Sequence, residues 1–306
     1  MKLTGKILTL LMLSLLVGCK DENKTVPPVP QMVKVVPQLD ESISSLGMKA
    51  AFPAENILEL QGKGRVVKLV SGSAAAFIDG IPLQLPAPVT LSPENFWCID
   101  PATVQNILLP LMEKRSFPIR KIVLDPGHGG HDKGAVSADG IMEKDLNLQL
   151  ASAIAEELEK CGFEVLLTRQ DDRFLTLDER PAFAAEKQAD IFISIHHIAS
   201  KNTDAYGSEV FLLKSENEEE NKRIISSWHP AFAIAKELTV ANFSTSRGVK
   251  TARFKVLRLS TIPAILIEAG FVSNKDEVKK LADPVHQKVF AKLTARALLS
   301  FHGKRK

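Results

Sequence analysis

Cysteine is scarce in this chain, which has only three cysteines among its 306 residues. Three are too few for a disulfide framework or for a zinc site built from thiolates. We expect Cys98 and Cys161 to be small buried thiols, although an oxidising compartment would allow them to pair. The scarcity therefore excludes the protein classes whose fold depends on cysteine.

A surplus of one charge is also missing, because 39 lysines and arginines face 36 acidic residues, for a net charge of +3. Nucleic-acid-binding proteins usually concentrate positive charge in a patch or stripe. The sequence has no such stripe, so nucleic acid is not an expected partner. No membrane-spanning apolar run follows Val17, and 45% of the residues are hydrophobic. We expect the body of the chain to be globular and soluble.

The first residues have the pattern of a bacterial export signal. The apolar run Ile7–Val17 follows two lysines and is too short to span a bilayer. It ends in Leu16-Val17-Gly18-Cys19, which resembles a lipobox and implies cleavage before Cys19 and acylation of that cysteine. An ordinary signal peptide that ends near a cysteine is the alternative. We predict a lipoprotein signal peptide at 1–18 and a lipid anchor on Cys19. In a Gram-negative organism, Lys20 favours the periplasmic face of the outer membrane.

Three further segments follow the export signal. Residues 19–50 lack periodicity and are rich in proline, valine and charge, which is typical of a tether. Residues 51–115 contain short alternating runs, with a hairpin signal at Asp79-Gly80 and a helix signal from Asp100 to Lys114. We predict that this second segment forms a small β-rich α+β domain.

From Lys121 onward, apolar strands alternate with amphipathic helices. The strands are expected at 121–124, 164–167, 191–195 and 264–267, and the clearest helices at Leu146–Lys160 and Asp178–Lys187. Strands that are apolar throughout favour a mostly parallel sheet with helices on both faces. We therefore predict an α/β domain at 121–303, with its site at the carboxyl ends of the strands.

Polar side chains follow three of these strands where each strand ends. His128 lies in a glycine-rich turn after the first, and His196 and Glu268 directly follow two others. Glu143 lies at the mouth of the helix that begins near Leu146. Two imidazoles and one carboxylate are a common ligand set for catalytic zinc. We predict that His128, Glu143 and His196 bind Zn²⁺, and that Glu268 transfers protons beside it.

Longer motifs around these residues closely resemble the zinc-dependent N-acetylmuramoyl-L-alanine amidases of bacterial cell walls. They are VLDPGHGGHDKG (123–134), EKDLNL (143–148), LLTR (166–169), ISIH (193–196), GSEVF (207–211) and IPAILIEAGFVSN (262–274). The resemblance covers 121–301 and implies a six-stranded α/β domain with one zinc ion. It also implies hydrolysis of the amide bond between N-acetylmuramic acid and L-alanine in peptidoglycan. His128, Glu143 and His196 match the family's zinc ligands, and Glu268 matches its catalytic glutamate.

The sequence departs from the family beside the third ligand, where the family commonly has Ala-Asn and this chain has His197-Ile198. Successive side chains of a strand alternate in direction, so only one of His196 and His197 faces the metal, and the register favours His196. We expect His131 to contact solvent or substrate rather than the metal. Arg169 and Arg180 are candidate contacts for substrate carboxylates, unless they are solvated or paired.

Several family members carry a long helical insertion that blocks the zinc. The matching segment here, Leu212–Arg247, contains an acidic run at 216–220 and one helix pattern near Pro230–Val240. We predict a solvated acidic loop, the one helix that the domain requires, and no large blocking helix.

Two other functions stay open from the sequence. One is a peptidoglycan-binding protein with little or no catalysis, which His197-Ile198 would allow. The other is a zinc peptidase that cuts the peptide stem. The expected partners are peptidoglycan and, through the lipid on Cys19, a membrane; cell-division or wall-remodelling proteins are further candidates.

Overall fold

The computed structural model describes residues 34–35, 47–62, 64–93, 96–112, 118–241 and 243–303. The predicted signal peptide (1–18), Cys19 and most of the predicted tether lie outside these residues. The described residues all belong to one compact unit, Met32–Lys306. None of their helices has the length and apolar character needed to cross a membrane.

The N-terminal part is built mainly from short strands, as the alternating pattern predicted, and most of them pair antiparallel. They are β2 (Lys49–Ala54), β3 (Ile57–Gly62), β4 (Arg65–Val70), β5 (Ser73–Ile78) and β6 (Ile81–Leu91), paired in that order. The short β1 (Lys34–Val35) pairs with β7 (Phe96–Cys98), which pairs with β6. Asp79 and Gly80 join β5 to β6 with positive φ angles, which confirms the predicted hairpin.

A short helical segment follows these strands. It consists of α2 (Pro101–Thr103), the π-helical turn η1 (Val104–Leu108) and α3 (Leu109–Met112). The side chain of Asp100 accepts a hydrogen bond from the Thr103 amide and caps the helical segment, which begins where the sequence predicted. Cys98 is exposed and Cys161 half-buried, and both are free thiols, so the prediction that both are buried is wrong.

The remaining elements alternate between strand and helix. The strands are β8 (Lys121–Pro126), β9 (Glu164–Leu167), β10 (Ile191–Ile198), β11 (Ser208–Leu213), β12 (Ser246–Ala252) and β13 (Ala264–Phe271). The helices are α4 (Glu143–Lys160), α5 (Glu179–Glu186), α6 (Glu218–Val240), α7 (Lys255–Leu259), α8 (Lys275–Leu281) and α9 (Pro284–Leu299). The strands and helices that the sequence predicted at 121–303 are therefore present.

The sheet is mixed and has more than the six strands that the family resemblance implied. Its order is β2-β3-β4-β5-β6-β12-β11-β13-β10-β8-β9. The N-terminal strands and β8–β13 form one sheet because β6 pairs with β12 at Leu83 and Val249. Within β8–β13 every neighbouring pair is parallel except β11 with β13. The expected six-stranded sheet was wrong because the β6–β12 contact joins residues far apart in sequence, which no local pattern records. The division into two domains at 51–115 and 121–303 stays a prediction.

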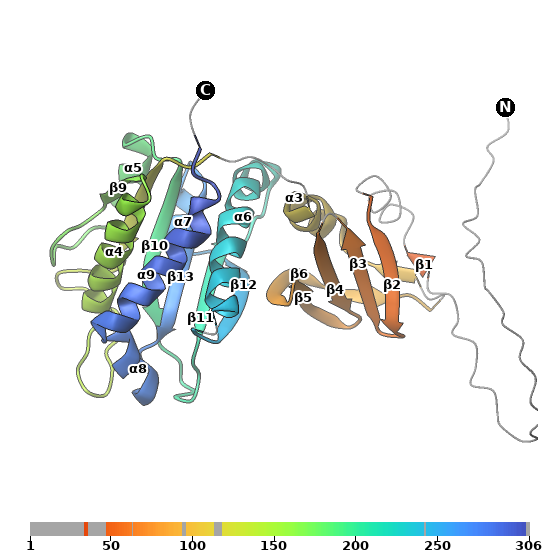
Figure 1. Cartoon of the computed structure of the whole chain (residues 1–306), viewed down its shortest axis with the longest axis horizontal. Helices are drawn as coiled ribbons and strands as arrows, with labels where there is room; N and C mark the ends of the chain where they lie inside the picture. Colours follow the sequence, from red (N-terminus) through yellow and green to blue (C-terminus); the bar gives the residue numbers. More distant parts are fainter. Residues whose placement is uncertain are drawn as a thin grey trace, which may run out of the picture. The chain divides into compact units, whose positions relative to one another are not determined.

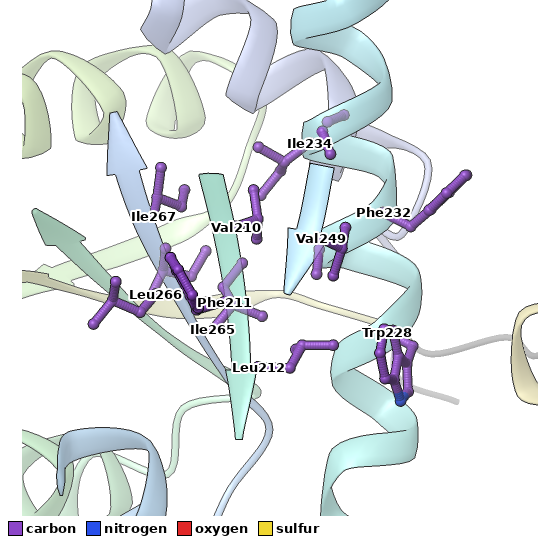
Figure 2. Close-up of a cluster of buried hydrophobic side chains, with 14 of the residues drawn as sticks. Val210, Phe211, Leu212, Trp228, Phe232, Ile234, Val249, Ile265, Leu266 and Ile267 are labelled. Atoms are coloured by element: carbon purple, nitrogen blue, oxygen red, sulfur yellow. The ribbon is translucent and has the colours of Figure 1, made fainter. Parts of the chain in front are cut away.

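Helices cover the central strands. Figure 1 shows α4, α9 and α6 side by side, and α5 packs against α7 elsewhere on the sheet. Every residue of β11 and β13 is buried, so both faces of these strands are covered; for β13 the apolar run at 264–267 predicted this. In Figure 2, α6 runs beside β11 and β12, and its Trp228 belongs to the same buried cluster as Leu212 of β11 and Val249 of β12.

The acidic run at 216–220 does not form the predicted loop. Glu218, Glu219 and Glu220 make up the first turn of α6, and the Asn217 side chain accepts a hydrogen bond from the Glu220 amide. Negative side chains are favourable at a helix N-terminus, where the backbone amides carry partial positive charge. The helix therefore begins well before Pro230, which lies inside it. The absence of a separate blocking helix stays a prediction.

Candidate metal centre and active site

The side chains of His128, Glu143 and His196 converge at the carboxyl edge of β8 and β10. One potential ligand atom from each lies within 4.8 Å of the other two. His128 Nε2 and His196 Nδ1 lie 3.1 Å and 2.9 Å from the same carboxylate oxygen of Glu143. Two imidazoles and a carboxylate that face one point fit a zinc ion with a fourth position left for water.

The turn after β8 brings His128 against β10. The Gly127 amide donates a hydrogen bond to the Ile195 carbonyl, and a Cβ atom at Gly127 would lie 2.2 Å from the His196 ring. Only glycine fits this close approach. His128 itself has a φ of 61°, in the left-handed region that non-glycine residues rarely adopt. The local backbone therefore places the two imidazole rings edge to face, with their centroids 4.9 Å apart.

Glu143 is the first residue of α4 and is buried. Its second carboxylate oxygen accepts a hydrogen bond from the Ala135 amide at 2.8 Å. Burial alone would raise the pKa of Glu143, but the hydrogen bonds from His128 and His196 outweigh burial and lower the pKa below its ordinary value. The carboxylate is therefore charged at neutral pH, as a metal ligand must be.

Asp132 is a site residue that the sequence analysis missed. Its carboxylate lies 2.8 Å from His128 Nδ1, which leaves Nε2 of the same ring facing Glu143. Burial lowers the pKa of His128, but the hydrogen bonds to Glu143 and then Asp132 outweigh it and raise the pKa overall. Such carboxylates commonly fix the tautomer of a metal-binding histidine. The sequence did contain a signal for Asp132, because it is an acidic residue four positions after His128 in the same glycine-rich turn.

His197 points away from the three converging side chains, as the alternation along a strand requires. Its ring is 1% exposed, and Nδ1 lies 2.7 Å from Asn147 Oδ1. Burial lowers the pKa of His197 to about 4, so the ring is neutral. Asn147 in turn donates a hydrogen bond to the Gly127 carbonyl at 3.2 Å. The residue pair His197–Asn147 thus ties β10 and α4 to the turn that carries His128.

His131 lies near the site but outside the group that could hold a metal. It is exposed, and its ring lies 4.2 Å from that of Phe174, measured between centroids. This placement agrees with the expectation that His131 contacts solvent or substrate.

Arg169 and Arg180 do not reach the surface; both are paired within the protein, which was the alternative left open to contact with substrate carboxylates. Their exposed fractions are 1% and 2%. Arg169 donates hydrogen bonds to the carbonyls of Pro126 and Gly127, and Arg180 donates to the His128 carbonyl. Both arginines therefore hold the turn that carries His128. The sequence could not distinguish a buried arginine from an exposed one.

Replacing Arg180 by alanine is expected to destabilise the fold. Arg180 forms an ion pair at 2.9 Å with Asp125, which is fully buried. Removing one partner of a buried pair typically costs about 3–5 kcal/mol, because the other charge is left uncompensated. Chemical denaturation of Arg180→Ala, with the exposed Arg120→Ala as control, measures the loss. A loss no larger than that of the control variant would contradict this account of the ion pair.

Glu268 lies on β13 directly beside His196 of β10, since the two are paired in register. It is 6% exposed, and its Oε2 atom has no hydrogen-bond partner among the described residues. Burial, and then the charges of Glu143 and Glu209, raise the pKa of Glu268 well above its ordinary value. A buried, unpaired acid beside a candidate metal centre is suited to proton transfer.

The raised pKa of Glu268 predicts how stability depends on pH. The folded state binds this proton more tightly than the unfolded state, so the contribution of Glu268 to wild-type stability falls as pH rises above about 4.5, the ordinary value. In the presence of a chelator, Glu268→Gln should therefore gain stability relative to the wild type between pH 4.5 and neutrality. Denaturation midpoints of both proteins across this range measure the difference. A difference that stays constant with pH would show that the Glu268 pKa is not raised.

Comparisons with known proteins agree on the family. The Amidase_3 family model, described as N-acetylmuramoyl-L-alanine amidase, matches residues 122–300, more than half of the chain. A crystal structure of the N-acetylmuramoyl-L-alanine amidase from Clostridium difficile 630 is 33% identical, with a TM-score of 0.55. The match covers 60% of this chain and 96% of that one.

Two curated relatives come from Bacillus subtilis. The uncharacterized protein YqiI is 36% identical over 183 residues, which are 60% of this chain and 85% of YqiI. The N-acetylmuramoyl-L-alanine amidase LytC is 35% identical over 182 residues, which are 59% of this chain but only 35% of LytC. The similarity to LytC therefore concerns one part of a longer protein.

Proposed function

Because this chain belongs to the Amidase_3 family of N-acetylmuramoyl-L-alanine amidases, we propose that it hydrolyses its amide substrate with the help of one zinc ion. The substrate bond joins N-acetylmuramic acid to L-alanine in peptidoglycan. His128, Glu143 and His196 would hold the zinc, and Glu268 would transfer the proton. The observation that carries this proposal is the convergence of three ligand atoms beside a buried, unpaired glutamate.

Each side chain has a separate task in this mechanism. Zinc held by the three residues would supply Lewis acidity, which lowers the pKa of a water molecule and polarises the scissile carbonyl. Glu268 accepts the proton of the attacking water and returns it to the leaving nitrogen of L-alanine. Its raised pKa makes the carboxylate a stronger base for the first of these steps. Asp132 holds the ring of His128 in the tautomer that ligation requires.

The identity of the new chain ends in digested sacculi tests this function. An amidase releases peptides whose free amino group belongs to L-alanine, whereas a peptidase that acts on the stem exposes an amino group of a later residue. A binding protein without catalysis releases neither. The buried state of Glu268 favours catalysis over binding alone, since an unpaired buried carboxyl group is costly to maintain.

We also propose that the protein is exported, because its substrate lies outside the cytoplasmic membrane. The sequence at 1–18 and Cys19 supports a lipid anchor, and Lys20 supports the outer membrane in a Gram-negative organism. Cell-division or wall-remodelling proteins are proposed partners.

The lipid anchor is tested with a single substitution. In cells that make the full chain, we expect wild-type protein in the membrane fraction and Cys19→Ser in the soluble fraction, because the variant lacks the acylated residue. Cys98→Ser, which changes an exposed thiol of the body, is the matched control and should stay with the membrane. Equal partition of the Cys19→Ser and wild-type proteins would rule out the anchor.

A further inference from the structure

The edge of the sheet that carries His196 and Glu268 continues across β11 and β12. Because β11 runs antiparallel to β13, the beginning of β11 lies where β13 ends, and β12 runs parallel to β11. Glu209, near the beginning of β11, is the registered partner of Glu268. Arg247, near the beginning of β12, forms an ion pair with Glu209. A row of side chains thus leads from the candidate metal centre to Arg247.

Arg247 is held in place on one side and open on the other. Its Nε atom donates a hydrogen bond to Glu209, and its guanidinium lies over the Phe271 ring, 5.2 Å from the centroid. Its side chain is nevertheless 40% exposed. The two Nη atoms have no hydrogen-bond partner among the described residues. Arg247 therefore presents two oriented donors at the surface, two strands away from Glu268.

The carboxylates that the structure describes near Arg247 do not accept hydrogen bonds from its two Nη atoms. Glu209 is buried, and its Oε1 atom also accepts a hydrogen bond from Lys250 at 2.7 Å. Glu277, a second nearby carboxylate, accepts hydrogen bonds from the backbone amides of Gly207 and Phe271. Both acids are thus engaged with groups of the protein, and the outer edge of the guanidinium is left for a ligand.

We propose that Arg247 binds a free carboxylate of the substrate's peptide stem and so selects stems that carry this charge. A guanidinium matches a carboxylate with two parallel hydrogen bonds, and an arginine that is already oriented loses little entropy on binding. The inference rests on the proposed function, because it takes Glu268 as the position of the scissile amide.

Strand spacing gives the distance from the scissile bond. Neighbouring strands lie about 4.8 Å apart, so the strand of Arg247, two strands from that of Glu268, lies roughly 10 Å away. An extended peptide covers about 3.3–3.6 Å per residue. The bound carboxylate therefore belongs to the first three residues of the stem. The peptide then lies over β11 and β12, and the sugar lies on the opposite side, toward β8.

Muramyl tripeptides with each free carboxylate converted in turn to a primary amide test this inference. With the full-length zinc-loaded protein, we expect that one of these amidated substrates has a kcat/KM about tenfold or more below that of the parent, mainly through a higher KM. In Arg247→Gln the same amidation should change kcat/KM less than twofold, and Arg247→Lys should keep part of the preference. Arg258→Gln, on the exposed face of α7, is the control and should behave as the wild type. Lys250 still pairs with Glu209 in these variants, so the fold should persist, and melting temperatures check it.

Two results would overturn the inference while the proposed function stands. One is a wild-type enzyme that cleaves all the amidated substrates as well as the parent. The other is an Arg247→Gln variant that keeps the wild-type preference. A wild-type enzyme that cleaves none of the substrates would contradict the proposed function and this inference with it.

Discussion

Glu268→Gln is expected to lower the kcat of amide hydrolysis by roughly 10²–10⁴-fold, the usual contribution of a positioned acid or base. Glutamine has nearly the same shape as glutamate but cannot accept the proton of the attacking water. Glu268 is not among the three converging side chains, so the variant should bind zinc as the wild type does. The rate of peptide release from sacculi measures the loss of hydrolysis, and the zinc content of the same samples measures metal binding.

The control for this experiment is Glu186→Gln, which makes the same chemical change on the exposed end of α5 and should leave kcat unchanged. If Glu268→Gln kept more than a tenth of the wild-type rate, Glu268 would not be the proton-transfer group. If the variant lost its zinc as well as its activity, Glu268 would act on the metal centre rather than on the substrate.

Glu143→Ala is expected to abolish both zinc binding and activity. Glu143 supplies the one carboxylate of the group, and both histidines face the same oxygen atom of it. A ligand that binds only the folded state stabilises it by about 4 kcal/mol when present at a thousand times its dissociation constant. Zinc should therefore raise the melting temperature of the wild type and leave that of Glu143→Ala unchanged.

Glu159→Ala, an exposed change near the far end of the same helix, is the matched control and should respond to zinc as the wild type does. Stabilisation of Glu143→Ala by zinc to the wild-type extent would exclude Glu143 as a ligand. Equal responses to zinc and magnesium in the wild type would contradict a site built from two imidazoles, since magnesium prefers oxygen ligands.

The convergence of His128, His196 and Glu268 could be predicted because each follows an apolar run. Such runs identify buried strands, and parallel strands end at one edge of a sheet. Alternation along a strand likewise separated His196 from His197. These features depend on local sequence and a simple rule of topology, so a single sequence was sufficient for them.

Other features depend on contacts that a local pattern does not contain. Arg169 and Arg180 are buried because carbonyl groups of the 126–128 turn surround them, and that turn is distant from both in sequence. The pairing of β6 with β12 likewise joins residues that are far apart in sequence. The acidic start of α6 was missed for a different reason. Asn217 followed three residues later by Glu220 is a recognisable helix start, but the density of charge suggested a loop instead.

Mass spectrometry of the soluble products from purified sacculi is the most direct test of the central claim. The zinc-loaded protein should release intact stem peptides that begin with L-alanine, and the remaining glycan should carry free lactyl carboxyl groups. Chelator treatment should stop the release, and added zinc should restore it. Peptides that begin at a later stem residue would contradict the account, as would release that continues unchanged after the metal is removed.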